Sequence, residues 1–63
     1  MNMSSNYRVY FDFHNERLHI DFLIAENTNL DYYSLFLSAK KEIEHKGYPL
    51  NECSNIGVIK KID

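Results

Sequence analysis

The chain has 63 residues, a single cysteine and a formal net charge of −2 at pH 7. A chain of this length forms one domain with a small core, and one cysteine excludes an intrachain disulfide. The weakly acidic balance argues against electrostatic binding of nucleic acid. No apolar run approaches the ~20 residues of a membrane span, and the start lacks the apolar stretch of a signal peptide. We therefore expect a single cytoplasmic domain over residues 1–63, with residues 1–5 as a disordered lead.

Two alternating segments predict a β-hairpin. Residues 7–13 and 18–24 each alternate apolar and polar side chains with a period of two, which is typical of half-buried strands. A two-residue turn at Asn15-Glu16, or a four-residue loop with the same register, matches every apolar residue of one face with an apolar partner. The pairs of this register are Phe13 with Leu18, Phe11 with Ile20, Val9 with Phe22, and Tyr7 with Ile24. A slip of one residue would destroy the match.

A helix is predicted over residues 28–46. Thr28 followed three positions later by Asp31 is a variant of the capping box that begins helices. Gly47 fits the left-handed position after a helix end, and Tyr48 would then contact Ile43 as in a Schellman motif. Both ends of the helix are therefore indicated by local signals.

The predicted helix carries two apolar stripes at about 100° per residue. The first is the expected core-facing stripe and consists of Tyr32, Phe36, Ala39 and Ile43. The second consists of Leu30, Tyr33 and Leu37, beside Lys41 and Glu44. Either the lead or the 50–55 loop covers this second stripe, or it binds a partner, because exposed Tyr and Leu rimmed by charges are typical of interfaces.

Residues 56–62 form the third predicted strand, in which Gly57 indicates a bulge that would bring Ile59 inward. The order is hairpin, helix, strand, which predicts an α+β domain with a three-stranded, mainly antiparallel sheet and one helix on one face. The third strand pairs either antiparallel beside the first strand or parallel beside the second, and we favour the first arrangement. The helix connection is expected to be right-handed, and the opposite sheet face stays open.

The side chains that could bind a metal or take part in catalysis lie on the open face. In the predicted register Asp12 lies opposite His19, and with His14 and Asp21 they form a conceivable zinc or manganese set. An exposed two-stranded patch offers no second shell and no water-excluding pocket. We therefore predict ordinary cross-strand charge pairing, with no metal, no cofactor and no enzymatic activity. Cys53 is expected to be a half-buried loop residue without an activating base.

Two surfaces are predicted for partner binding. The main one is the second helix stripe, Leu30, Tyr33 and Leu37; the other is the open sheet face with Tyr10 and Leu23. Tyr10 flanked by Arg8, Lys60 and Lys61 also suggests an alternative, a platform that stacks single-stranded nucleic acid. Asp12 and Asp21 beside Tyr10 would repel phosphate and argue against it.

The order of elements over residues 7–62 resembles that of small proteins made by lytic bacteriophages. These proteins include inhibitors of host RNA polymerase, anti-CRISPR proteins and antitoxins that block host toxins. The resemblance lies in length and architecture and includes no motif, so no functional residue carries over. It implies stoichiometric binding to a larger host protein in the host cytoplasm, without turnover. The alternatives are a homodimer whose second stripe pairs with itself, and the nucleic-acid binder.

Overall fold

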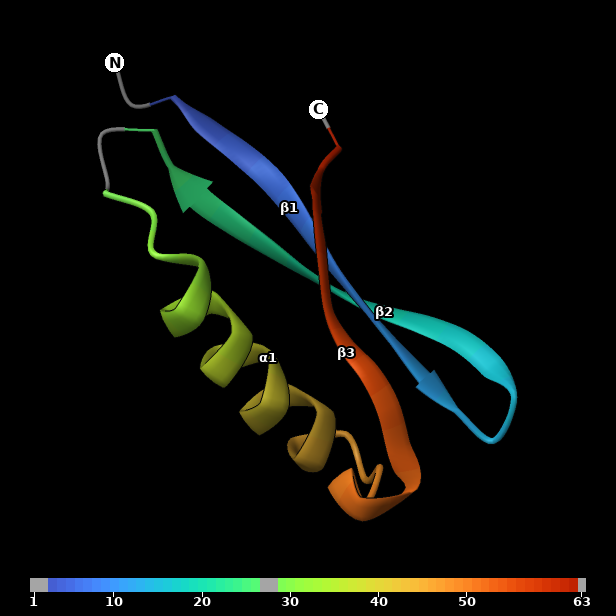
Figure 1. The fold of residues 1–63 in the computed structure, drawn as a ribbon. Helices are drawn as coiled ribbons and strands as arrows, with labels where there is room; N and C mark the ends of the chain where they lie inside the picture. Colours follow the sequence, from blue (N-terminus) through green and yellow to red (C-terminus); the bar gives the residue numbers. More distant parts are fainter. Residues whose placement is uncertain (1–2, 27–28, 63) are drawn as a thin grey trace.

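The computed structural model describes residues 3–26 and 29–62. Its elements are β1 (Ser4–Phe13), β2 (Glu16–Ala25), α1 (Tyr32–His45), a short 3-10 helix η1 (Leu50–Glu52) and β3 (Cys53–Lys61). The strands form an antiparallel sheet in the order β2-β1-β3, and α1 runs along one side of it (Figure 1). The predicted α+β class and the central position of the first strand are confirmed.

The hairpin turns one residue earlier than predicted. His14 and Asn15 both adopt positive φ, 48° and 67°, and Phe13 pairs with Glu16. Positive φ at both turn residues matches the twist of the flanking strands, so Glu16 stays extended as the first residue of β2. The other pairs of the apolar face are Phe11 with Leu18, Val9 with Ile20, Tyr7 with Phe22 and Ser5 with Ile24. The predicted register is wrong by two residues, but an even shift keeps every side chain on its expected face.

β1 also begins earlier than the apolar alternation indicates. Ser4 and Ser5, predicted to belong to a disordered lead, are its first two residues. Ser5 is only 3% exposed, and its hydroxyl donates a hydrogen bond to Glu26 Oε1 at 2.6 Å. Met1 and Asn2 lie outside the described residues. Two serines carry no hydrophobic signal, which is why the alternation alone did not include them.

α1 begins later than predicted. Asp31, not Thr28, is its N-cap: the Asp31 carboxylate accepts hydrogen bonds from the Tyr33 N–H at 3.0 Å and the Ser34 hydroxyl at 2.9 Å. Thr28 lies outside the described residues. Asp31 has an extended backbone, so it precedes the helix and cannot fill the third helical position that the predicted capping box gave it.

The end of α1 follows the prediction. Gly47 has φ +98° and its N–H donates to the Glu44 carbonyl at 3.0 Å, while the Tyr48 N–H donates to the Ile43 carbonyl at 3.2 Å. These two bonds define a Schellman motif. Tyr48 also packs against the core cluster that contains Ile43. The predicted stop and its apolar contact are therefore confirmed.

The core consists of two small clusters between α1 and the sheet. Val9, Leu35 and Ala39 form one, and Phe11, Ile20 and Ile43 form the other. The buried row of α1 is therefore Leu35, Ala39 and Ile43, spaced by four residues. Tyr32, predicted to face the core, is 58% exposed. The prediction for Tyr32 is wrong because the buried face of the helix is turned towards Leu35.

β3 contains the irregularity that Gly57 indicated. Tyr10 pairs with Val58 and Asp12 with Ser54, so residues 55–57 lie opposite Phe11 alone. Asn55 and Gly57 both have positive φ within this segment. Beyond it Ile59 pairs with Val9 and packs against the first cluster, while Ile56 packs against the second. The inward position predicted for Ile59 is thus confirmed.

Candidate functional site

Three of the large hydrophobic side chains that are exposed in the described residues lie on α1, in a surface here called the helix patch. It consists of Tyr32, Tyr33, Phe36 and Leu37. Tyr33 is 66% exposed, Tyr32 58% and Leu37 41%, whereas Phe36 is half-buried. Because α1 already buries one full row of side chains against the sheet, these residues are not needed for the core of the domain.

Phe36 anchors the helix patch to the edge of the sheet. A methyl group added to Gly57 of β3 would lie 3.8 Å from the Phe36 ring, so the ring covers the glycine. The Tyr33 and Phe36 ring centroids are 6.4 Å apart, and Lys40 Nζ lies 5.4 Å from the Phe36 centroid. The patch therefore presents aromatic surface, which is enriched in protein interfaces, with a lysine ammonium group packed over one ring.

Leu30, the third predicted contact of the helix stripe, does not belong to the patch. It precedes α1, is half-buried and packs against the cluster of Val9, Leu35 and Ala39. The sequence pattern missed Tyr32 and Phe36 as surface residues because it assigned both to the core. A later helix start and a slightly turned buried face explain both differences.

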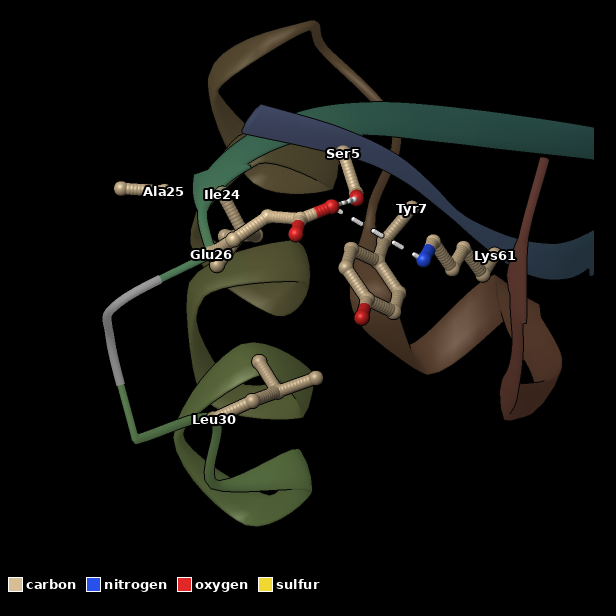
Figure 2. A pocket seen from close by; sticks show the side chains of 7 residues that line it. All are labelled: Ser5, Tyr7, Ile24, Ala25, Glu26, Leu30 and Lys61. Carbon is tan, nitrogen blue, oxygen red and sulfur yellow. Dashed lines mark hydrogen bonds and ion pairs between the residues drawn. The ribbon is translucent and has the colours of Figure 1, made fainter. Parts of the chain in front are cut away.

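Leu30 instead separates two small pockets. The first, of about 200 Å³, lies beside the ends of β1, β2 and β3 (Figure 2). In it Glu26 Oε1 accepts from the Ser5 hydroxyl and lies 4.0 Å from Lys61 Nζ. The second, of about 230 Å³, is lined by Ile24, Asn29, Leu30, Asp31, Ser34, Leu35 and Ser38. Glu26 and Lys61 of the first pocket already face each other. This pairing favours a role in holding the ends of the strands together over binding of a charged ligand.

The open face of the sheet is mostly polar, and the ion pair between Arg8 and Asp21 divides its apolar residues. Its rows across β2, β1 and β3 are Arg17, Asp12 and Ser54; His19, Tyr10 and Val58; and Asp21, Arg8 and Lys60. Leu23 is 68% exposed but pairs with Asn6, beyond the row that holds Arg8 and Asp21. Tyr10 and Leu23, predicted as one surface, are therefore separated by an ion pair and do not form a continuous apolar patch.

Tyr10 is surrounded by cationic and polar side chains. The Arg17 guanidinium carbon and Lys60 Nζ lie 5.7 and 6.0 Å from its ring centroid. The His19 ring meets it edge-on at 6.2 Å between centroids. A nucleobase would compete with these cations for the ring. Arg17 was missed as a neighbour because of the register shift, and Lys61, which pairs with Tyr7, lies on the other side of β3 from Lys60.

The carboxylates considered as metal ligands are held by nitrogen donors. Asp21 accepts from Arg8 Nε at 2.8 Å and Nη2 at 3.1 Å, and this hydrogen bonding lowers the pKa of Asp21 below its usual value. Asp12 accepts from Asn55 Nδ2 at 2.7 Å and from Arg17 Nε at 3.5 Å, and its pKa is lowered chiefly by Asn55. Both side chains are engaged within the sheet face.

The two histidines considered as metal ligands, His14 and His19, contact different residues. His14 contacts the Glu52 carboxylate at the far end of the molecule, and His19 Nε2 lies 4.0 Å from Asp21 Oδ2. In the part of the chain that the structure describes, no three His, Cys, Asp or Glu side chains gather to hold a metal ion.

Cys53 begins β3 and is half-buried. Its thiol lies 3.3 Å from the Pro49 carbonyl oxygen, to which it donates. Burial, followed by the neighbouring Glu52 carboxylate, raises the pKa of the Cys53 thiol. A raised pKa lowers the thiolate fraction and hence the nucleophilicity at neutral pH.

Within residues 3–26 and 29–62, no helix combines the length and apolar character needed to cross a membrane. A comparison of the chain with protein-family models, curated proteins and solved structures finds no match. The surfaces described above are therefore the basis for a functional proposal.

Proposed function

We propose that the chain is a non-enzymatic protein-binding module that acts by stoichiometric contact through the helix patch. Its partner would be a larger protein, in the manner of cytoplasmic inhibitors of host enzymes encoded by phages or mobile elements. The observation that supports the proposal most directly is the exposure of Tyr33 and Leu37 on a helix whose core-facing row is already complete. Exposed tyrosines are frequent anchors of protein interfaces, and an exposed apolar patch marks an interaction site.

The charges around the helix patch indicate the surface that would accept it. Lys40 lies over the Phe36 ring, and Lys41 is exposed one turn beyond Leu37. Asp31, at the opposite end, is occupied by its hydrogen bonds to the first turn of the helix. A complementary partner would offer an apolar groove with an acidic side chain near Lys40, because opposite potentials favour encounter and register.

The test compares capture by the wild-type chain with capture by the Tyr33→Ser/Leu37→Ser variant. Both purified chains are used to capture proteins from a bacterial lysate, and any protein retained only by the wild type is purified and titrated calorimetrically. We expect one-to-one binding by the wild type. The dissociation constant of the variant should be at least about 100-fold higher, since two contact residues are lost.

Leu23→Ser is the matched control, because Leu23 is as exposed as Tyr33 but lies on the open sheet face. The control should bind like the wild type. Equal capture by the wild type and the Tyr33→Ser/Leu37→Ser variant, with both folded by circular dichroism, would refute the helix patch as the contact surface. Loss of binding in the Leu23→Ser control would place the contact on the sheet instead.

A further inference from the structure

The outer edge of β2 carries backbone groups that pair with nothing in the described part of the chain. β2 pairs only with β1 there, in one continuous register over ten residues. The Glu26 N–H donates to the Met3 carbonyl at 2.8 Å and extends this register, so the even-numbered residues of β2 are those bonded to β1. The odd-numbered residues therefore direct their N–H and C=O groups outward. They are Arg17, His19, Asp21, Leu23 and Ala25.

The two edges of the sheet differ in protection. The edge strand β3 is interrupted at residues 55–57, and two lysines, Lys60 and Lys61, follow. Irregular backbone and charged side chains, lysine in particular, are devices by which proteins block edge-to-edge pairing. β2 contains no glycine, proline or lysine and no register shift, and two of its charged residues, Arg17 and Asp21, are already paired with Asp12 and Arg8 of β1.

We propose that β2 pairs antiparallel with β2 of a second copy of this chain, with the two-fold axis at Ile20. The two sheets would then join into one continuous six-stranded sheet. This inference concerns a different surface from the helix patch and does not depend on the proposed function. A 63-residue chain with two small core clusters gains burial from such pairing.

The central residues of β2, 18–22, are complementary to themselves in this register, whereas Arg17 and Glu16 lie opposite Leu23 and Ile24. On the open face, His19 of each copy lies opposite Asp21 of the other, which gives two favourable pairs. On the helix side, Leu18 lies opposite Phe22 twice and Ile20 meets itself. Leu18 and Phe22 are only half-buried in the single chain, so the second copy would cover them. About nine residues of each strand would pair, roughly 30 Å of edge.

Neighbouring registers are less favourable. A shift of the axis by one residue to Asp21 would set the Asp21 carboxylates of both copies against each other, and like charges directly opposite are destabilising. Moving the axis to His19 would shorten the paired segment from about nine residues of each strand to about seven. Pairing an odd-numbered with an even-numbered residue is excluded, because only the odd residues present outward hydrogen-bonding groups.

The experiment is sedimentation equilibrium of the full chain at micromolar to submillimolar concentration. We expect a species of twice 7.5 kDa for the wild type. His19→Asp places like charges opposite Asp21 twice and should raise the dissociation constant of the dimer at least about tenfold. His19→Arg places a permanent cation there and should strengthen dimerisation. Because His19 Nε2 also lies 4.0 Å from Asp21 Oδ2 within one chain, urea denaturation of both variants at a monomeric concentration separates an effect on folding from an effect on pairing.

Two further variants report the geometry. Ile20 faces its own counterpart in a non-hydrogen-bonded pair, where Cα atoms lie about 4.5 Å apart, within the range of a disulfide. Ile20 is also a core residue, so Ile20→Cys in a Cys53→Ser background is first shown to be folded by circular dichroism; it should then form a covalent dimer on mild oxidation. Lys60→Asp, on the protected edge, is the control and should leave self-association unchanged.

A monomer at all concentrations for the wild type and His19→Arg would overturn the inference. So would a dimer that survives His19→Asp but is lost in Tyr33→Ser/Leu37→Ser, because the helix patch would then be the self-contact. The His19→Asp chain should still bind a partner captured through the helix patch, so failure of one proposal is distinguishable from failure of the other.

Discussion

The Arg8 guanidinium on β1 holds the Asp21 carboxylate on β2 through two parallel hydrogen bonds. Nε lies 2.8 Å from Oδ1 and Nη2 lies 3.1 Å from Oδ2. Arg8 and Asp21 are direct cross-strand partners, so this bidentate pair fixes the register of the hairpin on its open face. The same pair separates Tyr10 from Leu23 and explains why that face is not a continuous apolar surface.

This pair predicts a dependence of stability on pH. The pKa of Asp21 is lowered from 3.8 by its hydrogen bonds to Arg8. Between the lowered pKa and 3.8, the unfolded chain binds more protons than the folded chain, so stability falls as pH drops through this window. Asp21→Asn should reduce that loss, measured as the change in urea midpoint between pH 5 and pH 2.5 at a concentration where the chain is monomeric. Asp12→Asn should reduce it independently, and an unchanged profile in the double variant would contradict the assignment.

The buried row of α1 predicts unequal effects of two neighbouring truncations. Leu35 is 5% exposed and Tyr32 is 58% exposed. Leu35→Ala should lower the free energy of unfolding by about 2–4 kcal/mol, because it removes buried methyl groups and leaves a cavity. Tyr32→Ala should lower it by less than about 1 kcal/mol. Urea denaturation compares the two, and a larger loss for Tyr32→Ala would restore the helix orientation expected from the sequence.

The N-cap predicts which residue begins the helix. Asp31 accepts hydrogen bonds from the Tyr33 N–H and the Ser34 hydroxyl. Asp31→Ala should therefore cost about 1 kcal/mol of stability, and Asp31→Asn should cost less, since the amide oxygen can still accept a bond. Thermal melts followed by circular dichroism provide the measurement. Asn29→Ala, an exposed change two residues earlier, should have little effect.

Local signals in the sequence account for the parts of the fold that were predicted correctly. Alternation identified the faces of both hairpin strands, and glycines marked the helix end at Gly47 and the bulge at Gly57, where positive φ is required. The predicted register was off by two residues because it gave every apolar residue of the face an apolar partner, whereas the observed register pairs Phe13 with Glu16 and Ile24 with Ser5. Only the left-handed backbone of His14 distinguishes the two, and histidine gives no strong turn signal.

The candidate surfaces were only partly predictable. Tyr33 and Leu37 were expected on an apolar face and are exposed, whereas Leu30 lies against the core because the helix begins after it. Which face of a short helix is buried depends on which of its side chains packs deepest. Here Leu35 is buried in place of Tyr32 because Leu35 packs against residues of β1 and β2. The free edge of β2 could not be read from the strand itself, since it depends on where β3 pairs.

The turn offers the sharpest test of the register. Asn15 has φ 67°, a conformation that glycine adopts without strain, so Asn15→Gly should raise the free energy of unfolding by about 0.5 kcal/mol. Glu16 is extended and belongs to β2, and Glu16→Gly should lower it by about 0.5–1 kcal/mol through added flexibility. If the turn were centred on Asn15-Glu16, both substitutions would stabilise the hairpin. The sign of the Glu16→Gly effect in urea denaturation therefore decides between the two registers. Lys41→Gly, at an exposed position inside α1, gives the size of the glycine penalty for comparison.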